Sequence, residues 1–121
     1  MSDAAYGEEL RTYYERAFAS DSSASGFIAE EDGVAVGMVT LIVAQHPPRK
    51  EGPDRRAYVT DMFVSEHARR RGHARSLMEA VPQRARDGCI TRLVLRTTET
   101  ARPLYESMGF VPFKTLALRV R

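Results

Sequence analysis

A strand, a loop and a helix follow one another directly in the middle of this chain, and this unit constrains the fold more than any other stretch. Residues 56–64 (RAYVTDMFV) are rich in β-branched and aromatic side chains, which predicts a mostly buried strand. Residues 72–87 then carry apolar side chains at i, i+3, i+4 and i+7, namely Ala74, Leu77, Met78 and Val81. Such a stripe is typical of a helix that packs against a sheet. Pro82 interrupts the pattern and predicts a kink or a restart of this helix.

Patterns before this unit predict a helix, a hairpin and a loop. Residues 4–19 have apolar side chains at helical spacing, and Ser2 or Asp3 would cap that helix. Residues 27–30 and 34–43 flank the turn signal Asp-Gly and are interpreted as two strands of a hairpin. The following stretch, HPPRKEGPD at positions 46–54, contains three prolines and a glycine, which predicts a loop and excludes a helix or a central strand.

Three short elements are predicted after this unit. Gly88 suits the end of the preceding helix, and a further strand is expected over residues 92–97. A short helix over 101–108 would end at Gly109, and residues 111–120 predict a last strand. The whole order is helix, strand, strand, strand, helix, strand, helix, strand, which predicts a mixed α/β sheet flanked by helices.

Length and charge restrict the class of protein. The chain has 121 residues, which suits a single domain with one core. Its formal net charge of +2 is too small for bulk affinity for nucleic acid or membranes, so any preference for anions must be local. Cys89 is the sole cysteine, which permits no internal disulfide, and the chain shows no secretory signal or membrane-spanning run. These features favour a cytoplasmic protein.

The run ARRRGHARSL lies where the central strand gives way to the helix. Unpaired backbone N–H groups and the helix dipole attract phosphate at such a junction. Gly72 would let the backbone approach an anion, and the arginines of the run raise the local potential. A solvated charged turn and a nucleic-acid patch are the alternatives, but the run lacks the interleaved aromatics of a nucleic-acid surface. A diphosphate fits this junction better than a duplex does.

Two motifs give the chain a family resemblance. Residues 57–113, with VTDMFVSEHARRRGHARSLMEAV and ARPLYESMGFVPF, resemble the GNAT superfamily of acyl-CoA-dependent N-acetyltransferases. Its Arg/Gln-x-x-Gly-x-Gly/Ala pattern is matched by Arg69, Gly72 and Ala74, and Tyr105 lies in a segment similar to the family's Tyr-Glu-x-x-Gly-Phe motif. The resemblance covers about residues 26–120. It implies a GNAT-like α+β domain with a central, mostly antiparallel mixed sheet, and acetyl-CoA as cosubstrate.

The resemblance also implies which residues bind acetyl-CoA. The pantetheine arm would pair with the backbone of the central strand at Met62, Phe63 and Val64. The diphosphate would bind mainly backbone N–H groups of the loop and first helical turn, which correspond to Arg69, Arg70, Arg71, Gly72, His73, Ala74 and Arg75. Thr98 occupies a place where many members carry an Asn that touches the cofactor.

Catalytic roles follow from the same resemblance. An amine would attack the thioester directly, and Tyr105 would donate a proton to the departing thiolate; the alternative for Tyr105 is a place in the core. Some members carry a Glu at what corresponds to Thr60, whereas the acid here is Asp61, and adjacent residues of a regular strand face opposite sides. A bulge would let Asp61 act as the base or bind a cationic substrate. Pairing of Asp61 with an arginine, and proton removal through water, are the alternatives.

The remaining chemistry-bearing residues predict no further site. The three histidines are His46, His67 and His73. Their spacing is not that of metal ligands, so no metal is expected, and each is expected at the surface. Cys89 is expected to be a packed or idle thiol. Aromatic residues of the first predicted helix belong to the core or line an acceptor pocket; they are Tyr13, Tyr14 and Phe18.

The chain departs from the family pattern at its start and in the loop. Family members commonly begin with a strand before the first helix, and the sequence predicts no such strand here, so residues 27–30 would form an uncovered edge. A homodimer or a missing N-terminal piece would explain this. His73 and Arg70 replace the usual apolar residue and Gly, but contacts through the backbone should survive both changes.

Three functions remain as hypotheses. The first is transfer of an acetyl group from acetyl-CoA to a primary amine of a small molecule or a protein, by direct attack in a ternary complex. The second is a non-catalytic GNAT-like module that binds CoA or has a structural role. The third is a basic nucleic-acid binder, although neither nucleic acid nor a membrane is the expected partner.

Overall fold

The computed structural model describes residues 24–120 continuously and, before them, residues 2, 4–5, 8–9, 11–12 and 15–16. Each of the described residues between 4 and 16 is helical, and the backbone N–H of Ala5 donates to Ser2 Oγ at 3.1 Å, which confirms Ser2 as a cap there. The aromatic residues assigned above to this helix, Tyr13, Tyr14 and Phe18, lie outside the described residues.

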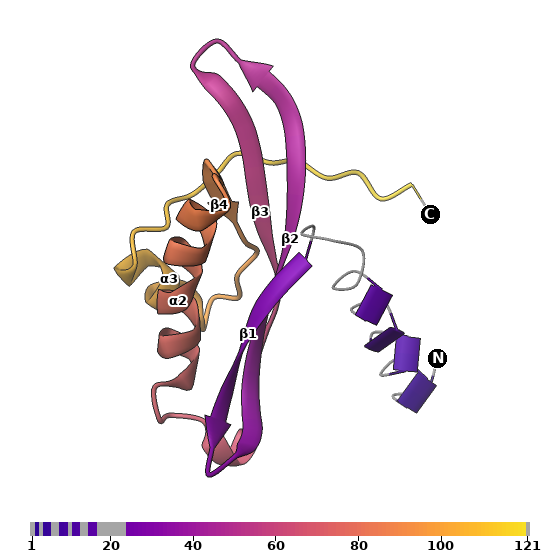
Figure 1. Cartoon of the computed structure of the whole chain (residues 1–121), viewed down its shortest axis with the longest axis vertical. Helices are drawn as coiled ribbons and strands as arrows, with labels where there is room; N and C mark the ends of the chain where they lie inside the picture. The colour runs from indigo at the N-terminus through magenta and orange to yellow at the C-terminus, as the bar shows by residue number, and fades with distance from the viewer. Residues whose placement is uncertain are drawn as a thin grey trace.

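Four strands form one mixed sheet in the order β1-β2-β3-β4 (Figure 1). They are β1 (Ala24–Glu31), β2 (Val34–Arg49), β3 (Gly52–Val64) and β4 (Arg92–Val94). The first three pair antiparallel and β4 joins β3 in parallel, which confirms the predicted mixed, mostly antiparallel sheet. Parallel pairing needs a crossover, and the helix between β3 and β4 supplies it.

Two helices lie on one face of this sheet (Figure 1). These are α2 (His73–Asp87) and α3 (Arg102–Ser107), and a short 3-10 turn, η1 (Glu66–Ala68), precedes α2. The core lies between the sheet and the helices and contains Val39, Leu41, Leu77, Met78, Val81 and Tyr105. Among the described residues, no helix is long and apolar enough to span a membrane.

The central helix confirms its predicted end, and of the two outcomes predicted at Pro82 the restart does not occur. α2 runs through Pro82 without a restart, because the proline removes only one backbone hydrogen bond while Val81 and Ala85 on either side stay buried. The helix ends at Gly88, as predicted. However, the left-handed residue after it is Cys89, with φ of 58°. The Ile90 N–H then donates to the Ala85 carbonyl at 2.9 Å, the closing bond of a Schellman motif.

The loop predicted for residues 46–54 is wrong, because most of it continues the hairpin. β2 extends to Arg49 and β3 begins at Gly52, so the turn is short. The register shifts between His46 and Arg49, which places both intervening prolines in an irregular part of the ladder. Among the residues that the structure describes, β1 pairs with β2 only as far as Ile42, so no third described strand requires an N–H from these prolines.

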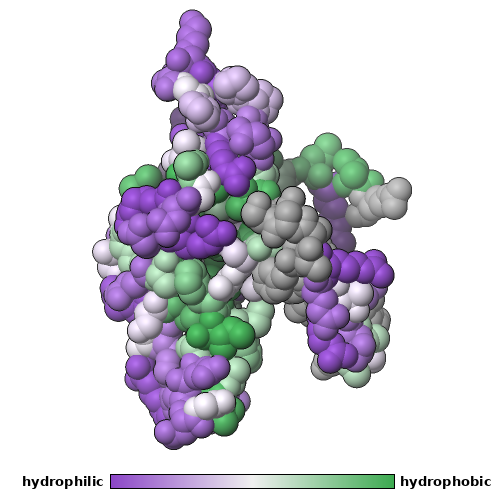
Figure 2. Space-filling model, viewed as in Figure 1, coloured by the Kyte–Doolittle hydropathy of each residue, from purple (hydrophilic) through white to green (hydrophobic). Residues whose placement is uncertain are grey.

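The last predicted strand, residues 111–120, is also wrong, and β4 is shorter than the predicted 92–97. The tail after α3 is extended but pairs with no described strand, and Leu116 is completely exposed at 101%. Figure 2 shows hydrophobic side chains on this tail beyond the body of the molecule. Within this tail, the ring centroid of Phe113 lies 5.6 Å from the guanidinium carbon of Arg56 and 4.6 Å from that of Arg92. Cation–π contacts therefore attach the start of the tail to β3 and β4.

Candidate functional site

Six consecutive backbone amides at the start of α2 make no hydrogen bond within the described part of the chain. They belong to Arg70, Arg71, Gly72, His73, Ala74 and Arg75. The first bond of this helix runs from the Ser76 N–H to the Gly72 carbonyl at 3.0 Å, and no side chain caps the helix. Unpaired amides at the positive end of a helix dipole form a binding site for an anion.

Two left-handed residues shape this loop. Arg70 has φ of 65° and Gly72 has φ of 85°. A Cβ built on Gly72 would meet no protein atom within 4 Å, so the space beside the amides is open. The positive φ, rather than crowding, is what requires glycine here. A concave run of amides produced by left-handed residues is a common way to hold phosphate.

Most arginine side chains of the loop are bonded to the protein itself. Arg69 Nε donates to the Val64 carbonyl at 3.0 Å, and Arg71 Nη1 lies 2.5 Å from Glu31 Oε2. Arg75 Nη2 donates to Ser107 Oγ at 3.0 Å, which connects the start of α2 to α3. The guanidinium groups therefore brace the loop, and the backbone amides are left to bind a ligand.

The strand that leads into the loop separates from its parallel neighbour. β3 pairs with β4 only over residues 56–58, and among the described residues no strand continues on that side. On its other side β3 remains bonded to β2 through Met62, Phe63 and Val64. The open edge offers N–H and C=O groups to an amide-bearing ligand, although Arg69 already occupies the Val64 carbonyl.

A bulge in β3 changes the direction of the acid. Asp61 pairs with Thr40 whereas Val59 pairs with Leu41, so Thr60 is an extra residue between them. Leu41 and Val59 pack in the core below α2, and directly opposite residues share a face, so Asp61 lies with Thr40 on the other face of the sheet. Thr60 is there too, because its Oγ1 lies 2.8 Å from the Thr40 Oγ1. The expectation that residues 60 and 61 face opposite sides therefore fails at this bulge.

Tyr105 has a buried ring and an accessible hydroxyl. Its side chain belongs to the core, its exposed fraction is 7%, and its ring packs edge-on against Phe110 with centroids 5.9 Å apart. No buried side-chain polar atom among the described residues lacks a partner, yet the Tyr105 hydroxyl makes no hydrogen bond to any of them. That hydroxyl must therefore reach solvent. Burial of the ring raises the pKa of the Tyr105 phenol.

Thr98 has a local structural role. Its Oγ1 accepts from the Ala101 N–H at 3.2 Å and its carbonyl accepts from the Arg102 N–H at 3.0 Å. These bonds fix the start of α3, the helix that carries Tyr105.

The histidines occupy three different environments. His67 is exposed, as predicted, but the prediction is wrong for His73, whose Nε2 lies 2.5 Å from Glu31 Oε1 and whose side chain is 18% exposed. His46 is half-buried, and its Nε2 lies 3.0 Å from the Tyr58 hydroxyl. Over the residues that the structure describes, no three His, Cys, Asp or Glu side chains are placed to hold a metal. Cys89 is exposed rather than packed.

Sequence patterns missed the two side chains that brace the loop from outside it. Glu31 lies at the end of β1 and Ser107 lies on α3, far along the chain from their arginine partners. Glu31 belongs to no motif, and Ser107 occupies an unspecified position of the Tyr-Glu-x-x-Gly-Phe motif. The only signal was the position of Glu31 directly before a predicted turn, and that position does not reveal a contact with the loop.

Comparisons with known proteins agree with this geometry. A family model described as the acetyltransferase (GNAT) family matches residues 2–110. Human N-acetyltransferase 8 is 32% identical over 98 residues, which cover 78% of this chain and 42% of the human protein. The chain thus spans less than half the length of that relative.

Solved structures show the same fold. A GCN5-related N-acetyltransferase from Ralstonia eutropha JMP134 superposes with a TM-score of 0.83 at 29% identity, covering 97% of this chain and 77% of that one. A predicted acetyltransferase with acetyl-CoA from Clostridium acetobutylicum also gives 0.83, at 23% identity, covering 93% and 74% of the two chains.

Proposed function

Because this chain belongs to the acetyltransferase (GNAT) family, we propose that it transfers an acetyl group from acetyl-CoA to a primary amine of a small molecule or a protein. The observation that carries the proposal is the run of six unpaired amides over residues 70–75. They are suited to the diphosphate of acetyl-CoA. The open edge of β3 at residues 62–64 would pair with the pantetheine arm. Thr98, which fixes the start of α3, would lie near that arm.

In the proposed reaction the acceptor and acetyl-CoA are bound together. The lone pair of the neutral amine forms the new C–N bond at the thioester carbonyl, and the C–S bond then breaks. Tyr105 donates its proton to the departing sulfur, since its raised pKa keeps the phenol protonated and its hydroxyl is accessible. A main-chain N–H of the β3 edge would polarise the carbonyl as negative charge develops on its oxygen.

Asp61 is the proposed acceptor of the proton that the amine loses. The bulge at Thr60 supports this role, because it brings Asp61 to the sheet face away from the core. The same carboxylate would attract a protonated amine before reaction. Both roles predict that acceptors with a cationic amine are preferred over neutral nucleophiles.

Two measurements test the proposed function. Titration with CoA should raise the unfolding temperature of the protein, since a ligand that binds only the native state stabilises it. Incubation with acetyl-CoA and a panel of amino acids, polyamines, aminoglycosides and peptides should release free CoA. Absence of any thermal shift at millimolar CoA would exclude the cofactor site.

A non-catalytic CoA-binding or structural module is the second candidate. It is favoured by Thr60, which has no carboxyl group and stands at the position where some family members carry Glu. This candidate predicts binding of CoA without release of CoA for any amine in the panel. Turnover with one acceptor would eliminate it.

The 121 residues would form one acyltransferase domain, located in the cytoplasm. We also propose that two copies of the chain form a homodimer. Within the described residues β1 pairs only with β2, and the tail carries exposed Leu116, Leu118 and Val120, features that suit an association of chains. Light scattering that shows a monomer at high concentration would exclude the dimer.

A further inference from the structure

Glu31 binds two residues of the loop formed by residues 69–75, the proposed cofactor loop, with one carboxylate. Its Oε2 lies 2.5 Å from Arg71 Nη1 and its Oε1 lies 2.5 Å from His73 Nε2. These partners stand immediately before and after Gly72, 40 and 42 residues further along the chain. A single carboxylate thus holds both sides of the left-handed glycine.

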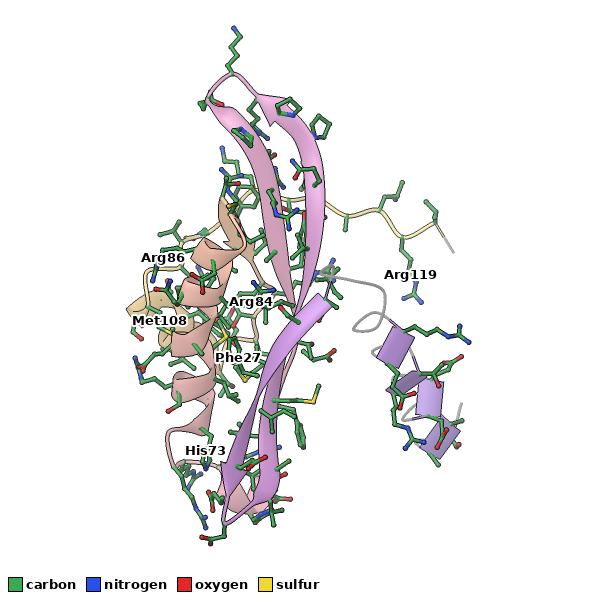
Figure 3. All side chains as sticks on the ribbon, viewed as in Figure 1. Phe27, His73, Arg84, Arg86, Met108 and Arg119 are labelled. Carbon is green, nitrogen blue, oxygen red and sulfur yellow. The ribbon has the colours of Figure 1, made fainter. Side chains whose placement is uncertain are left out.

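The neighbouring strand directs this side chain toward the loop. The β1–β2 register shifts between Ala29 and Glu30, and the bulge includes the buried Val36. The Val36 carbonyl accepts from the Ser65 N–H at 2.7 Å, so the bulge is bonded to the segment that begins the loop. Figure 3 shows His73 at the start of α2, beside the end of β1. The end of β1 and the cofactor loop therefore form one bonded unit.

The carboxylate is charged under ordinary conditions. The hydrogen bond with His73 is the main cause that lowers the pKa of Glu31, and Arg71 lowers it further, whereas burial opposes them. Because its charge is compensated by Arg71, the carboxylate contributes mainly geometry to the loop.

We propose that Glu31 is a positioning residue, which keeps the amides of residues 70–75 in their binding arrangement before acetyl-CoA arrives. This inference rests on the proposed function. A loop with two left-handed residues and six unpaired amides has few bonds of its own, and without a brace its ordering would oppose ligand binding. Glu31 supplies that order in advance through two side chains.

The test compares ligands that differ in the diphosphate. Glu31→Ala should weaken binding of CoA and of dephospho-CoA by about tenfold each, since both carry the diphosphate. Turnover of S-acetylpantetheine, which lacks it, should not change, and kcat at saturating acetyl-CoA should not change either. Glu31→Gln keeps an acceptor oxygen without the charge and should recover part of the affinity. The matched control is Glu30→Gln, on the exposed face of the same strand.

Several results would overturn the inference. Unchanged binding of CoA by both variants would show that Glu31 does not order the loop. Tighter binding would show the same, and would mean that the negative charge of Glu31 only repels the ligand. An equal loss with S-acetylpantetheine would indicate general structural damage rather than positioning. If Glu31→Ala fails to fold, the comparison of Glu31→Gln with the wild type decides. A wild-type protein that binds no CoA would instead remove the proposed function itself, so the two failures are distinguishable.

Discussion

At the scale of single residues, Tyr105 combines a buried ring with a reachable hydroxyl. The core holds the ring, and burial raises the pKa of the phenol, so the group stays protonated at neutral pH. Tyr105→Phe should therefore lower kcat about 100-fold while leaving the affinity for CoA unchanged. Steady-state kinetics and a CoA titration check this. An unchanged kcat would show that Tyr105 has only a structural role.

Cys89 occupies a backbone conformation that favours glycine. Its φ is 58°, and its N–H and that of Ile90 close the end of α2. Cys89→Gly should raise the free energy of unfolding by about 0.5–1 kcal/mol, because it removes the Cβ strain of a left-handed residue. Urea denaturation measures the change, and Cys89→Ala, which keeps the Cβ, should give no gain. A loss of stability in the glycine variant would contradict this reading.

Asp54 should make part of the stability pH-dependent. Arg56 is the main cause that lowers the pKa of this carboxyl, to about 2 from an ordinary 3.8. Since the folded pKa lies below the unfolded one, the stabilisation is complete above the unfolded value and disappears as the pH falls through the folded value. The difference in unfolding free energy between wild type and Asp54→Asn should stay constant above about pH 5 and shrink between pH 4 and 2. A difference that persists unchanged to pH 2 would contradict the pairing; Glu51→Gln, at the exposed turn, is the control.

At the level of residues, the sequence indicated the loop where the signal is local, and its role in binding acetyl-CoA stays a prediction. The spacing of Arg69, Gly72 and Ala74 identified the loop, and the structure places its unpaired amides there. Glu31 could not be predicted, because its contacts depend on how the strands pair. The direction of Asp61 was also out of reach, since a bulge is a property of two strands together.

At the scale of elements, the core helix and the tail should respond oppositely to mutation. Leu77→Ala removes a buried side chain of α2 and should cost about 2–5 kcal/mol of unfolding free energy. Leu116→Ser changes a fully exposed side chain and should cost less than about 0.5 kcal/mol. Chemical denaturation of both variants provides the comparison. A large loss for Leu116→Ser would mean that the tail is packed in solution, either against the sheet or against a second chain.

The incorrect element predictions share one physical cause. Residues 111–120 have the composition of a strand, but a strand also needs a partner for its backbone, and none of the described strands provides one. Conversely, the prolines of residues 46–54 argued against a strand, yet the hairpin admits them at an irregular part of the ladder, beside which no other described strand pairs with β2. Propensity is local, whereas pairing is decided by the whole sheet.

At the scale of the whole molecule, the sheet brings the separate parts of the site together. The element order predicted helices against a mixed sheet, and the structure and the family agree with it. The antiparallel hairpin fixes the bulge at Thr60, and the short parallel pairing with β4 opens the edge beyond residue 58. The bond between Arg75 and Ser107 then relates the amide loop to the helix of Tyr105. The amide loop, the open edge of β3 and the Tyr105 phenol are thus brought together by long-range contacts, which local patterns do not encode.

The central claim is that the amides of residues 70–75 bind the diphosphate of acetyl-CoA. The most direct measurement is the amide chemical shift of each residue in ¹⁵N-labelled protein during a titration with CoA. The account predicts that these six amides show the largest changes, and that pantetheine, which lacks the diphosphate, leaves them nearly unmoved. Saturable binding of CoA with the largest changes elsewhere, and none in the loop, would contradict it.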